Sequence, residues 1–269
     1  MEGFSHEYVN DNLVRIKCPG YVFAYLAIGT MKAALIDTGY GYGSIKEYVR
    51  TITDLPLTVI LTHAHFDHSG GVMEFDNIFV APEDLDVLKR DITIERRASL
   101  ICDYYGYPKE GLFPPKEVTS VSLLDGMEFP LGGLTVKALK MGGHTKGSMC
   151  ILFKEMRTVL FGDACNSYCM MIFEESSTVE EYQKALIDFK KYEKDYDTVL
   201  YSHPGNFGGK EILDEMIEVC EGVLDGTCLG SVYEPVTERE GIFYVAKERG
   251  ENGRRADGKA ANLLYEVIR

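Results

Sequence analysis

The chain has 269 residues, of which 45% are hydrophobic and 26% are charged, and its formal net charge at pH 7 is −14. This composition is typical of a globular protein with a large core, whereas the negative charge argues against a surface that follows nucleic-acid phosphates. No apolar run approaches the roughly 18 residues of a membrane helix, and the first residues, MEGFSHEY, show no secretory signal. We therefore expect a cytoplasmic protein of one domain, residues 1–269, that binds neither nucleic acid nor a membrane.

The first part of the chain predicts strands followed by a helix. Apolar or alternating runs with turn signals between them predict strands at residues 13–17, 21–28, 33–36 and 57–61. Ser44 is a suitable N-cap, and the apolar positions after it have helical spacing until Pro56. The run at 57–61 is short and rich in β-branched residues, so we expect a buried strand that stops where a histidine-rich segment begins.

A segment of different character follows the next strand, which is predicted at residues 78–81. Pro82 suits the first turn of a helix, and residues 83–117 become helical and then irregular, with several tyrosines and two adjacent prolines. We interpret 83–117 as a helical insertion over one face, either as a lid or as a contact in a possible homodimer. The alternative is an ordinary pair of surface helices.

The second half of the chain has the same order of elements. Strand patterns occur at residues 127–129, 134–139, 149–153, 158–161, 198–201, 241–246 and 263–268. Amphipathic helices are predicted at residues 177–192 and 211–224. Strands come first in each half and then alternate with helices, which indicates an α/β protein.

Metal-binding side chains are concentrated in residues 63–68, which read His-Ala-His-Phe-Asp-His. The chain contains only six histidines, and three of them lie in this segment. Imidazole is the commonest metal ligand in proteins, and a carboxylate beside it widens the choice of metal. Further candidates follow apolar strands or lie in glycine-rich turns, which brings the set to His63, His65, Asp67, His68, His144, Asp163 and His203.

The spacing of these candidates favours two metal positions over one. His63 and His65 are alternate residues and point the same way in an extended segment, whereas Asp67 and His68 then turn away. Seven ligands exceed a tetrahedral catalytic site, which usually takes three protein groups and a water. Because most candidates follow strand ends, we expect them at one edge of the sheets, around two divalent metals that share a carboxylate.

Five motifs extend over nearly the whole chain: IDTG at 36–39, THAHFDHSGG at 62–71, GGHTKGS at 142–148, FGDA at 161–164 and SHPG at 202–205. In this order they resemble the motifs of metallo-β-lactamase-fold hydrolases, in particular the glyoxalase-II-like and lactonase-like branches. The resemblance implies an α/β fold that is a four-layer αβ/βα sandwich. The metals would lie at one edge of its two sheets, and the helical insertion would follow the first metal motif.

The resemblance also implies roles for individual residues. His63, His65 and His144 would hold one metal, Asp67, His68 and His203 would hold the second, and Asp163 would bridge both. Asp37, in the IDTG motif, would orient a ligand imidazole, as metal-bound histidines generally require, and Thr145 would act in the same way. Tyr168, shortly after the bridging residue, and Tyr105, in the insertion, are the candidate substrate contacts.

The chemistry implied is metal-assisted hydrolysis. Two metal ions, zinc first and iron or manganese as alternatives, would deprotonate a water and polarise the oxygen that it attacks. The hydroxide would attack a thioester, ester or lactone carbonyl of a small molecule, with Asp163 bridging the metals and Asp67 accepting a proton. Asp163 stands where the β-lactamase branches use Cys or lack that ligand, which argues against a true β-lactamase.

Two other activities stay open within the resemblance. A small-molecule phosphodiesterase would use the same pair of metals. A mononuclear-iron persulfide dioxygenase resembles the glyoxalase-II branch and can retain all seven residues, so metal analysis and oxygen uptake would separate it from a hydrolase. A non-catalytic domain would be expected to have lost ligands, and none is lost in this sequence.

Overall fold

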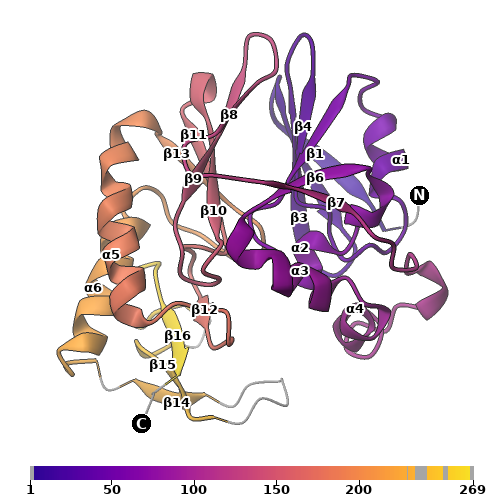
Figure 1. The fold of residues 1–269 in the computed structure, drawn as a ribbon. Coiled ribbons are helices and arrows are strands. Elements are labelled where there is room, and N and C mark those ends of the chain that lie inside the picture. The colour runs from indigo at the N-terminus through magenta and orange to yellow at the C-terminus, as the bar shows by residue number, and fades with distance from the viewer. Residues whose placement is uncertain (1–2, 229, 234–240, 251–253, 267–269) are drawn as a thin grey trace.

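The computed structural model describes residues 3–228, 230–233, 241–250 and 254–266. Its main body consists of four layers: a pair of helices, a sheet, a second sheet and a group of shorter helices, from left to right in Figure 1. The four-layer α/β arrangement expected from the sequence is therefore confirmed. Among the described residues, no helix is long and apolar enough to cross a membrane.

The first sheet contains seven strands in chain order: β1 (Ser5–Asn10), β2 (Leu13–Cys18), β3 (Val22–Ile28), β4 (Ala33–Ile36), β5 (Leu57–Ile60), β6 (Asn77–Val80) and β7 (Thr119–Ser122). β1 to β4 pair antiparallel, and β4 to β7 pair parallel. Every residue of β4 is buried, as is usual for a strand that is covered on both faces. The parallel part brings the carboxyl ends of its strands to one edge of the sheet.

The second sheet has the order β13 (Thr198–Tyr201), β11 (Thr158–Gly162), β10 (Met149–Phe153), β9 (Thr135–Lys140) and β8 (Glu128–Pro130). β11 and β13 pair parallel, and the other neighbours pair antiparallel. The segments that follow β11 and β13 therefore leave the sheet at the same edge. Their sequences are apolar because both faces of this sheet are covered.

The apolar core between the two sheets fixes their distance and orientation. Tyr25 and Ile36 of the first sheet pack in one cluster with Ile151 and Leu160 of the second, and all four are fully buried. Burying a large apolar side chain stabilises the fold by roughly 1.5–3 kcal/mol. Because alternate residues of a strand point to opposite faces, Leu26 lies instead in the cluster between the first sheet and its helices.

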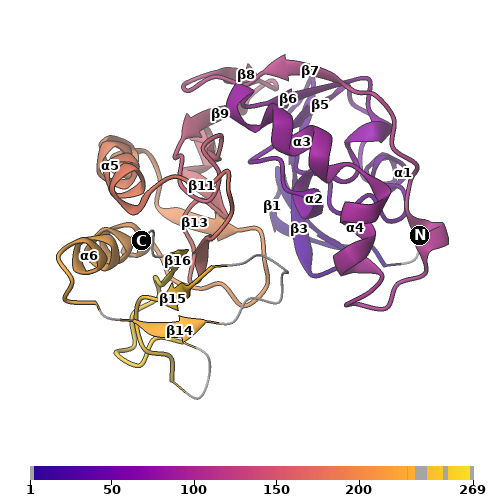
Figure 2. The same cartoon turned by 60° about the horizontal axis from the view of Figure 1, so that its bottom comes forward.

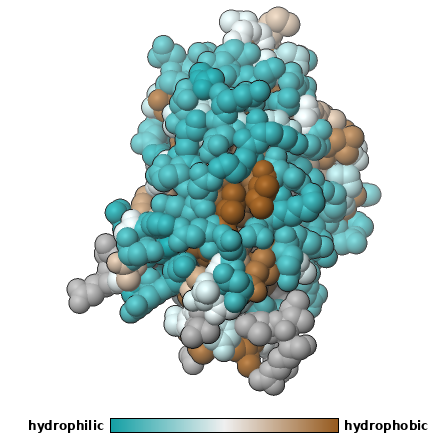
Figure 3. Space-filling model, turned by 90° about the vertical axis from the view of Figure 1, so that its left-hand side faces the viewer, coloured by the Kyte–Doolittle hydropathy of each residue, from teal (hydrophilic) through white to brown (hydrophobic). Residues whose placement is uncertain are grey.

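Helices cover the outer face of each sheet (Figures 1 and 2). The first sheet is covered by α1 (Ile45–Arg50), α2 (Phe66–Ser69), α3 (Leu85–Asp91) and α4 (Ile94–Ile101), and the second by α5 (Val179–Phe189) and α6 (Ile212–Leu224). Short 3-10 helices are η1 (Val72–Glu74), η2 (Pro82–Asp84), η3 (Lys109–Gly111), η4 (Lys154–Met156) and η5 (Lys190–Asp195). The face formed by α5 and α6 is mostly hydrophilic, with one small hydrophobic patch (Figure 3).

A third, smaller sheet was not expected from the sequence. Its order is β12 (Cys169–Met171), β16 (Leu263–Glu266), β15 (Phe243–Val245) and β14 (Ser231–Tyr233). It lies at the bottom of Figure 1, next to α6 in Figure 2. The strands predicted at 241–246 and 263–268 correspond to β15 and β16, and residues 267–269 lie outside the described part of the chain.

The segment 83–117 contains α3, α4 and η3, so its helical character agrees with the sequence. Both α-helices pack on the first sheet, and Ala98 and Ile101 of α4 are buried in the cluster beneath them. Its action as a lid or as a dimer contact stays a prediction, as does the assignment of residues 1–269 to one domain.

Candidate metal centre

The seven candidate ligands lie in segments that follow strands of the two large sheets. His63 and His65 follow β5, Asp67 and His68 lie in α2, His144 lies between β9 and β10, Asp163 follows β11, and His203 follows β13. The structure brings all seven side chains together in three overlapping groups. Within each group the potential ligand atoms lie within 4.8 Å of one another.

Two of these groups share no residue. Site A is His63, His65 and His144, and site B is Asp67, His68 and His203. The backbone explains the division, because His65 is extended, with φ −62° and ψ 151°, and is the N-cap of α2. Helix α2, which follows, then places the Asp67 and His68 side chains in site B.

Asp163 lies between the two sites. Its Oδ2 is 3.2 Å from Nε2 of His203 and 3.5 Å from Nε2 of His68, both in site B. The same oxygen is 3.9 Å from Nε2 of His144 in site A. One carboxylate is thus within reach of both sites, which is the position that a bridging ligand needs.

Each of the five clustered imidazoles has one ring nitrogen bonded to a partner outside the two sites. The bonds join His63 to the Thr62 hydroxyl at 3.1 Å, His65 to Glu175 at 2.8 Å, His68 to Asp37 at 2.9 Å, His144 to the Met170 carbonyl at 2.6 Å and His203 to the Tyr21 carbonyl at 3.0 Å. Such bonds fix the tautomer and the orientation of a ligand imidazole.

The remaining ring nitrogens fit a metal site. Nε2 of His63 and Nε2 of His68 are buried and have no hydrogen-bond partner among the described residues. Buried polar atoms without a partner are rare, because each costs free energy. Nδ1 of His65 and Nε2 of His144 are only 2.9 Å apart. A cation in site A would satisfy the nitrogens of His63, His65 and His144, and a second cation in site B would satisfy that of His68. The donor set therefore suits divalent metal ions.

Asp37 connects His68 to the end of β5. Its Oδ2 accepts hydrogen bonds from Nδ1 of His68 at 2.9 Å and from the Thr62 hydroxyl at 2.7 Å, and its Oδ1 accepts from the Thr62 N–H at 2.7 Å. Asp37 is buried and has a positive φ of 63°, a left-handed conformation that Asp and Asn adopt more readily than most residues. Its carboxylate therefore holds this imidazole and joins it to the backbone at the end of β5.

Thr145 does not contact an imidazole in the way expected from the sequence. Among the described contacts, its hydroxyl donates to Oδ2 of Asp84 at 2.9 Å and bonds Ser148. Asp84 is buried and also accepts from the N–H groups of Ala64 and Gly147, each at 3.0 Å. Thr145 therefore supports the loop backbone around site A through Asp84. Its role in orienting a ligand imidazole stays a prediction.

Two further residues near site A had no signal in the sequence. Glu175, between β12 and α5, accepts a hydrogen bond from His65 although the two residues are 110 positions apart. Arg90, at the end of α3, donates to both oxygens of Glu175, at 2.6 and 3.1 Å, from 85 positions away. No local pattern marks such long-range partners, so only the folded structure identifies them.

The environment favours the neutral form of two imidazoles of site A, those of His63 and His144. Burial, together with the neighbouring His68, holds the pKa of His63 well below its ordinary value. Burial and the nearby His65 lower the pKa of His144 to about 4. A neutral imidazole is the form that binds a metal.

Site B carries charge in the metal-free protein. Burial alone would lower the pKa values of its two histidines, but the charge of Asp67 raises that of His68 well above its ordinary value. In the same way Asp163 raises the pKa of His203 to about 10. Although burial opposes this, these histidines hold the pKa values of Asp67 and Asp163 well below their usual range. Two positive imidazoles thus face two carboxylates.

Aromatic rings surround both sites. The ring of Phe173 lies 4.6 Å from that of His65, between ring centroids. On the other side, Tyr105 of the insertion lies 5.5 Å from Tyr21, whose carbonyl holds His203. Burial and the charge of Asp67 raise the pKa of Tyr105. Its role as a substrate contact stays a prediction.

Tyr168 packs against the third sheet. Its ring is 6.2 Å from that of Tyr233, and the guanidinium of Arg249 lies 5.0 Å from its centroid. These described ring contacts are with β14 of the third sheet and with the segment after β15, and not with the seven candidate ligands. Its predicted role as a substrate contact stays a prediction.

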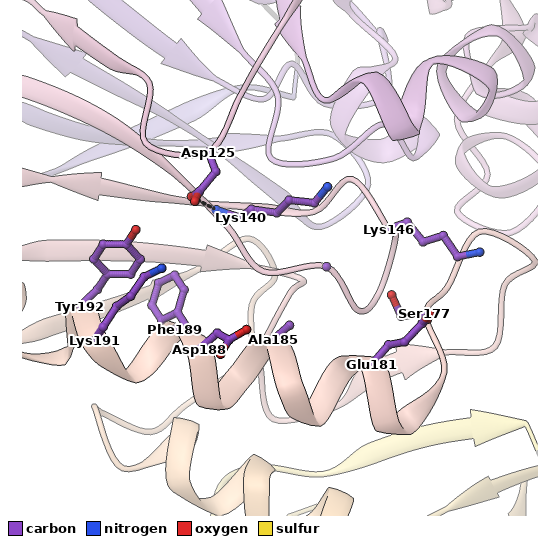
Figure 4. A pocket seen from close by; sticks show the side chains of 11 residues that line it. Asp125, Lys140, Lys146, Ser177, Glu181, Ala185, Asp188, Phe189, Lys191 and Tyr192 are labelled. Carbon is purple, nitrogen blue, oxygen red and sulfur yellow. Dashed lines mark hydrogen bonds between the residues drawn. The ribbon is translucent and has the colours of Figure 1, made fainter.

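Two pockets open on the surface near these elements. One of about 420 Å³ adjoins site B, since it is lined by His203 together with Arg15, Phe23 and Phe207. The other, of about 340 Å³, lies beside α5 and contains none of the seven candidate ligands (Figure 4). Lys146 and Lys191 lie at opposite ends of this second pocket, so its positive charges are spread apart.

The sequence profile described as "Metallo-beta-lactamase superfamily" matches residues 19–203. The protein named acyl-coenzyme A thioesterase MBLAC2 of Bos taurus is 27% identical over 241 residues, which cover 79% of this chain and 85% of that protein. An atrochrysone carboxyl ACP thioesterase of Aspergillus fumigatus is 29% identical over 156 residues, which cover 56% of this chain and 41% of that protein.

Solved structures of low sequence identity have the same fold. The DIM-1 metallo-beta-lactamase exposed to ceftazidime superposes with a TM-score of 0.59 at 14% identity, covering 82% of this chain and 98% of that one. An archaeal metallo-beta-lactamase superfamily protein from Sulfolobus tokodaii gives a TM-score of 0.54 at 20% identity, covering 83% and 86% of the two chains.

Proposed function

The chain belongs to the metallo-beta-lactamase superfamily, and from this premise we propose that it is a metal-dependent hydrolase of acyl thioesters carried by coenzyme A or a similar carrier. The observation that carries this proposal is the likeness to the MBLAC2 thioesterase, which extends over 79% of this chain and 85% of that protein. The cluster of seven candidate ligands supports it, since each one has a side chain that can bind a metal.

Site A and site B would each hold one divalent ion, with Asp163 shared between them. When bound, two such ions would activate a water molecule and polarise the carbonyl oxygen of the substrate. We expect zinc first, because zinc suits sites of imidazole and carboxylate, with iron or manganese as alternatives. Asp37 and Glu175 would hold His68 and His65 in place, and Asp67 would accept a proton as the carbonyl is attacked.

A thioester makes the smallest demand on the surrounding side chains. Its leaving group is a thiolate, and because an ordinary thiol has a pKa of about 8.5, the thiolate can depart with little help from a proton donor. An alkoxide from a lactone is far more basic and needs protonation as it leaves. Among the seven candidate ligands, only Asp67, once it has accepted a proton, would be able to protonate an alkoxide. A thioester needs no such donor, which favours the thioester over the ester or lactone.

The test is a comparison of substrate classes on the metal-loaded protein. Acetyl-, octanoyl- and palmitoyl-coenzyme A would be followed by the release of free thiol, beside a chromogenic lactone and bis(p-nitrophenyl) phosphate. We expect kcat/KM to be highest for a thioester and turnover to be lost in Asp163→Asn, with the exposed Asp54→Asn as the control of equal charge change.

Three results would contradict the proposal. The first is a preference for the phosphodiester, which would indicate a phosphodiesterase. The second is oxygen uptake with glutathione persulfide by a protein that contains one iron, which would indicate a dioxygenase. The third is an Asp163→Asn variant with the full thioesterase activity of the unmodified protein.

A further inference from the structure

A chain of charged side chains connects the insertion helix α3 to site A. Nε2 of His65 donates to Oε1 of Glu175 at 2.8 Å, and the guanidinium of Arg90 donates to Oε1 at 2.6 Å and to Oε2 at 3.1 Å. The His65 and Glu175 side chains are only 6% and 9% exposed. A bidentate pair between Arg and a carboxylate is a strong and directional contact, so Glu175 is held in one orientation.

This contact decides which nitrogen of His65 faces site A. A carboxylate accepts but does not donate, so Nε2 carries the proton and Nδ1 is left with its lone pair. Nδ1 then lies 2.9 Å from Nε2 of His144, on the side of site A. The other two histidines of site A have a hydroxyl and a backbone carbonyl as outer partners. Glu175 is therefore the one charged outer partner described for this site.

Arg90 also reaches the backbone beside His65. Its Nε donates to Oδ1 of Asp91 at 2.6 Å, and Oδ2 of the buried Asp91 accepts from the N–H of Phe66 at 3.2 Å. Phe66 is the first residue of α2, so Asp91 satisfies an amide that His65 as N-cap leaves without a side-chain acceptor. One arginine thus fixes two carboxylates, of which one holds the His65 ring and the other the adjoining amide.

We propose that Glu175 is the positioning residue for His65, and that Arg90 of the insertion clamps it so that the insertion sets the metal affinity of site A. This inference rests on the proposed function only in taking His65 as a metal ligand. It assigns no contact with substrate to either residue. Its test therefore reads metal binding in the absence of substrate.

The first experiment measures zinc binding by competition with a chromogenic chelator. In Glu175→Gln the side-chain oxygen can still accept a hydrogen bond, but the charge and the bidentate pair with Arg90 are lost. Because loss of such an outer partner typically lowers metal affinity about 10- to 100-fold, we expect one zinc ion to bind that much more weakly and the other to bind normally. Glu174→Gln is the matched control, since this neighbour is exposed.

Arg90 provides a second pair of variants that leave Glu175 intact. Arg90→Gln removes the clamp, and Arg90→Lys keeps the charge but not the fork that grips both oxygens. We expect zinc affinity at site A to fall in the order unmodified protein, Arg90→Lys, Arg90→Gln. If Glu175→Gln fails to fold, this series tests the proposal in its place. Folded Arg90 variants that bind zinc at site A as tightly as the unmodified protein would overturn the role of the clamp.

The second readout is the tautomer of His65 in the metal-free protein. Side-chain nitrogen NMR should show the proton on Nε2 of His65 in the unmodified protein and a mixture of tautomers in Glu175→Gln, with the other imidazoles unchanged. A purely structural role of Glu175 would not move this signal alone. Unchanged His65 signals together with unchanged zinc affinity in folded Glu175→Gln would overturn the proposal.

Failure of this inference and failure of the proposed function are separable. If no thioester is cleaved but Glu175→Gln loses zinc from one site, the positioning role stands and the substrate assignment falls. If thioesters are cleaved and zinc binding does not respond to Glu175, the reverse holds.

Discussion

The five clustered histidines differ in what holds their outer nitrogen, and this difference occurs within each of the two sites. His65 in site A and His68 in site B each bond a carboxylate, whereas His144 and His203 bond backbone carbonyls. A carboxylate partner raises the basicity of the ligand imidazole more than a neutral acceptor does. Each site thus contains one imidazole whose strength as a ligand depends on a removable charge.

For site B that charge is Asp37, and its removal should weaken one metal only. Asp37→Asn keeps a residue that tolerates the left-handed backbone at φ 63°, so it isolates the loss of charge from backbone strain. We expect binding of one zinc ion to weaken about 10- to 100-fold, measured by competition with a chelator. Asp54→Asn, at an exposed position, should bind both ions normally. Equal weakening of both ions in Asp37→Asn would show that the two sites are not separate.

The two sites should also load metal over different ranges of pH. His144, whose pKa is about 4, is neutral at any higher pH and ready to bind. His203, whose pKa is about 10, carries a proton at neutral pH that a metal must displace. Affinity at site B should therefore rise as the pH rises towards 10, while protonation of His144 should not limit binding at site A above about pH 4. Calorimetric zinc titrations at about pH 5.5, 7 and 8.5 would measure both steps.

The raised pKa of His203 also affects the stability of the metal-free protein. A histidine with a raised pKa in the folded state stabilises the fold fully below its unfolded pKa of about 6.5, and this contribution is lost as the pH rises through the folded value. The unfolding free energy of the chelated protein should thus fall between pH 7 and pH 10. Zinc affinities at both sites that do not change with pH would contradict this assignment of charges.

At the scale of elements, strands with an apolar pattern were predictable and strands without one were not. β4 and β5 were found because their apolar runs lie between turn signals. β1 and β7 were missed because all their residues are exposed, so their sequences show no alternation. β12 was missed because it has three residues and owes its conformation to pairing with β16. Pairing between distant segments leaves no local signal.

The residues of the candidate site also divide into those that could be predicted from the sequence and those that could not. The ligand motifs could be found because each combines a rare residue type with a strand end and with glycines nearby. Glu175, Arg90, Asp84 and Asp91 could not, because charged residues are common and their partners lie far away along the chain. The acceptor of the Thr145 hydroxyl, Asp84, could not be predicted for the same reason, since it lies 61 positions away along the chain.

Helix α4 is fixed by a buried arginine, and this makes a prediction for stability. Arg97 is fully buried and donates to backbone carbonyls of Tyr40, Gly41, Gly70 and Phe113, which belong to the loops around α2. Arg97→Met would leave these buried acceptors without a donor, so we expect a loss of about 3–5 kcal/mol of unfolding free energy in urea. Lys109→Met, an exposed position in the same insertion, should change it by less than about 0.5 kcal/mol.

The outcome of this comparison also bears on the insertion as a whole. A large loss in Arg97→Met would mean that α4 is part of the folded core and not a freely moving lid. A small loss, close to that of the Lys109 control, would contradict the role assigned to Arg97.

At the scale of the whole molecule, the apolar cores and the metal centre occupy different places. One apolar cluster lies between the two large sheets. A second lies between the first sheet and its helices, and a third lies between the second sheet and its helices. None of these clusters contains one of the seven candidate ligands. Because these apolar clusters are extensive, we expect the fold not to depend on a metal in the way that a small zinc-stabilised domain does. The candidate ligands gather instead at the edge where strands end.

Metal removal should accordingly lower the melting temperature without unfolding the chain. A ligand present at 100 times its Kd stabilises a protein by about 2.7 kcal/mol, and 1 kcal/mol shifts the Tm of a chain of this size by roughly 2–4 °C. Chelation removes two such ions, so we expect Tm to fall by roughly 10–20 °C and to recover when zinc is added back. Scanning calorimetry would measure the shift, and far-ultraviolet circular dichroism should stay unchanged at 25 °C because the apolar clusters remain intact. A chelated chain that loses its circular dichroism signal would show that the metals, and not the cores, hold the four layers together.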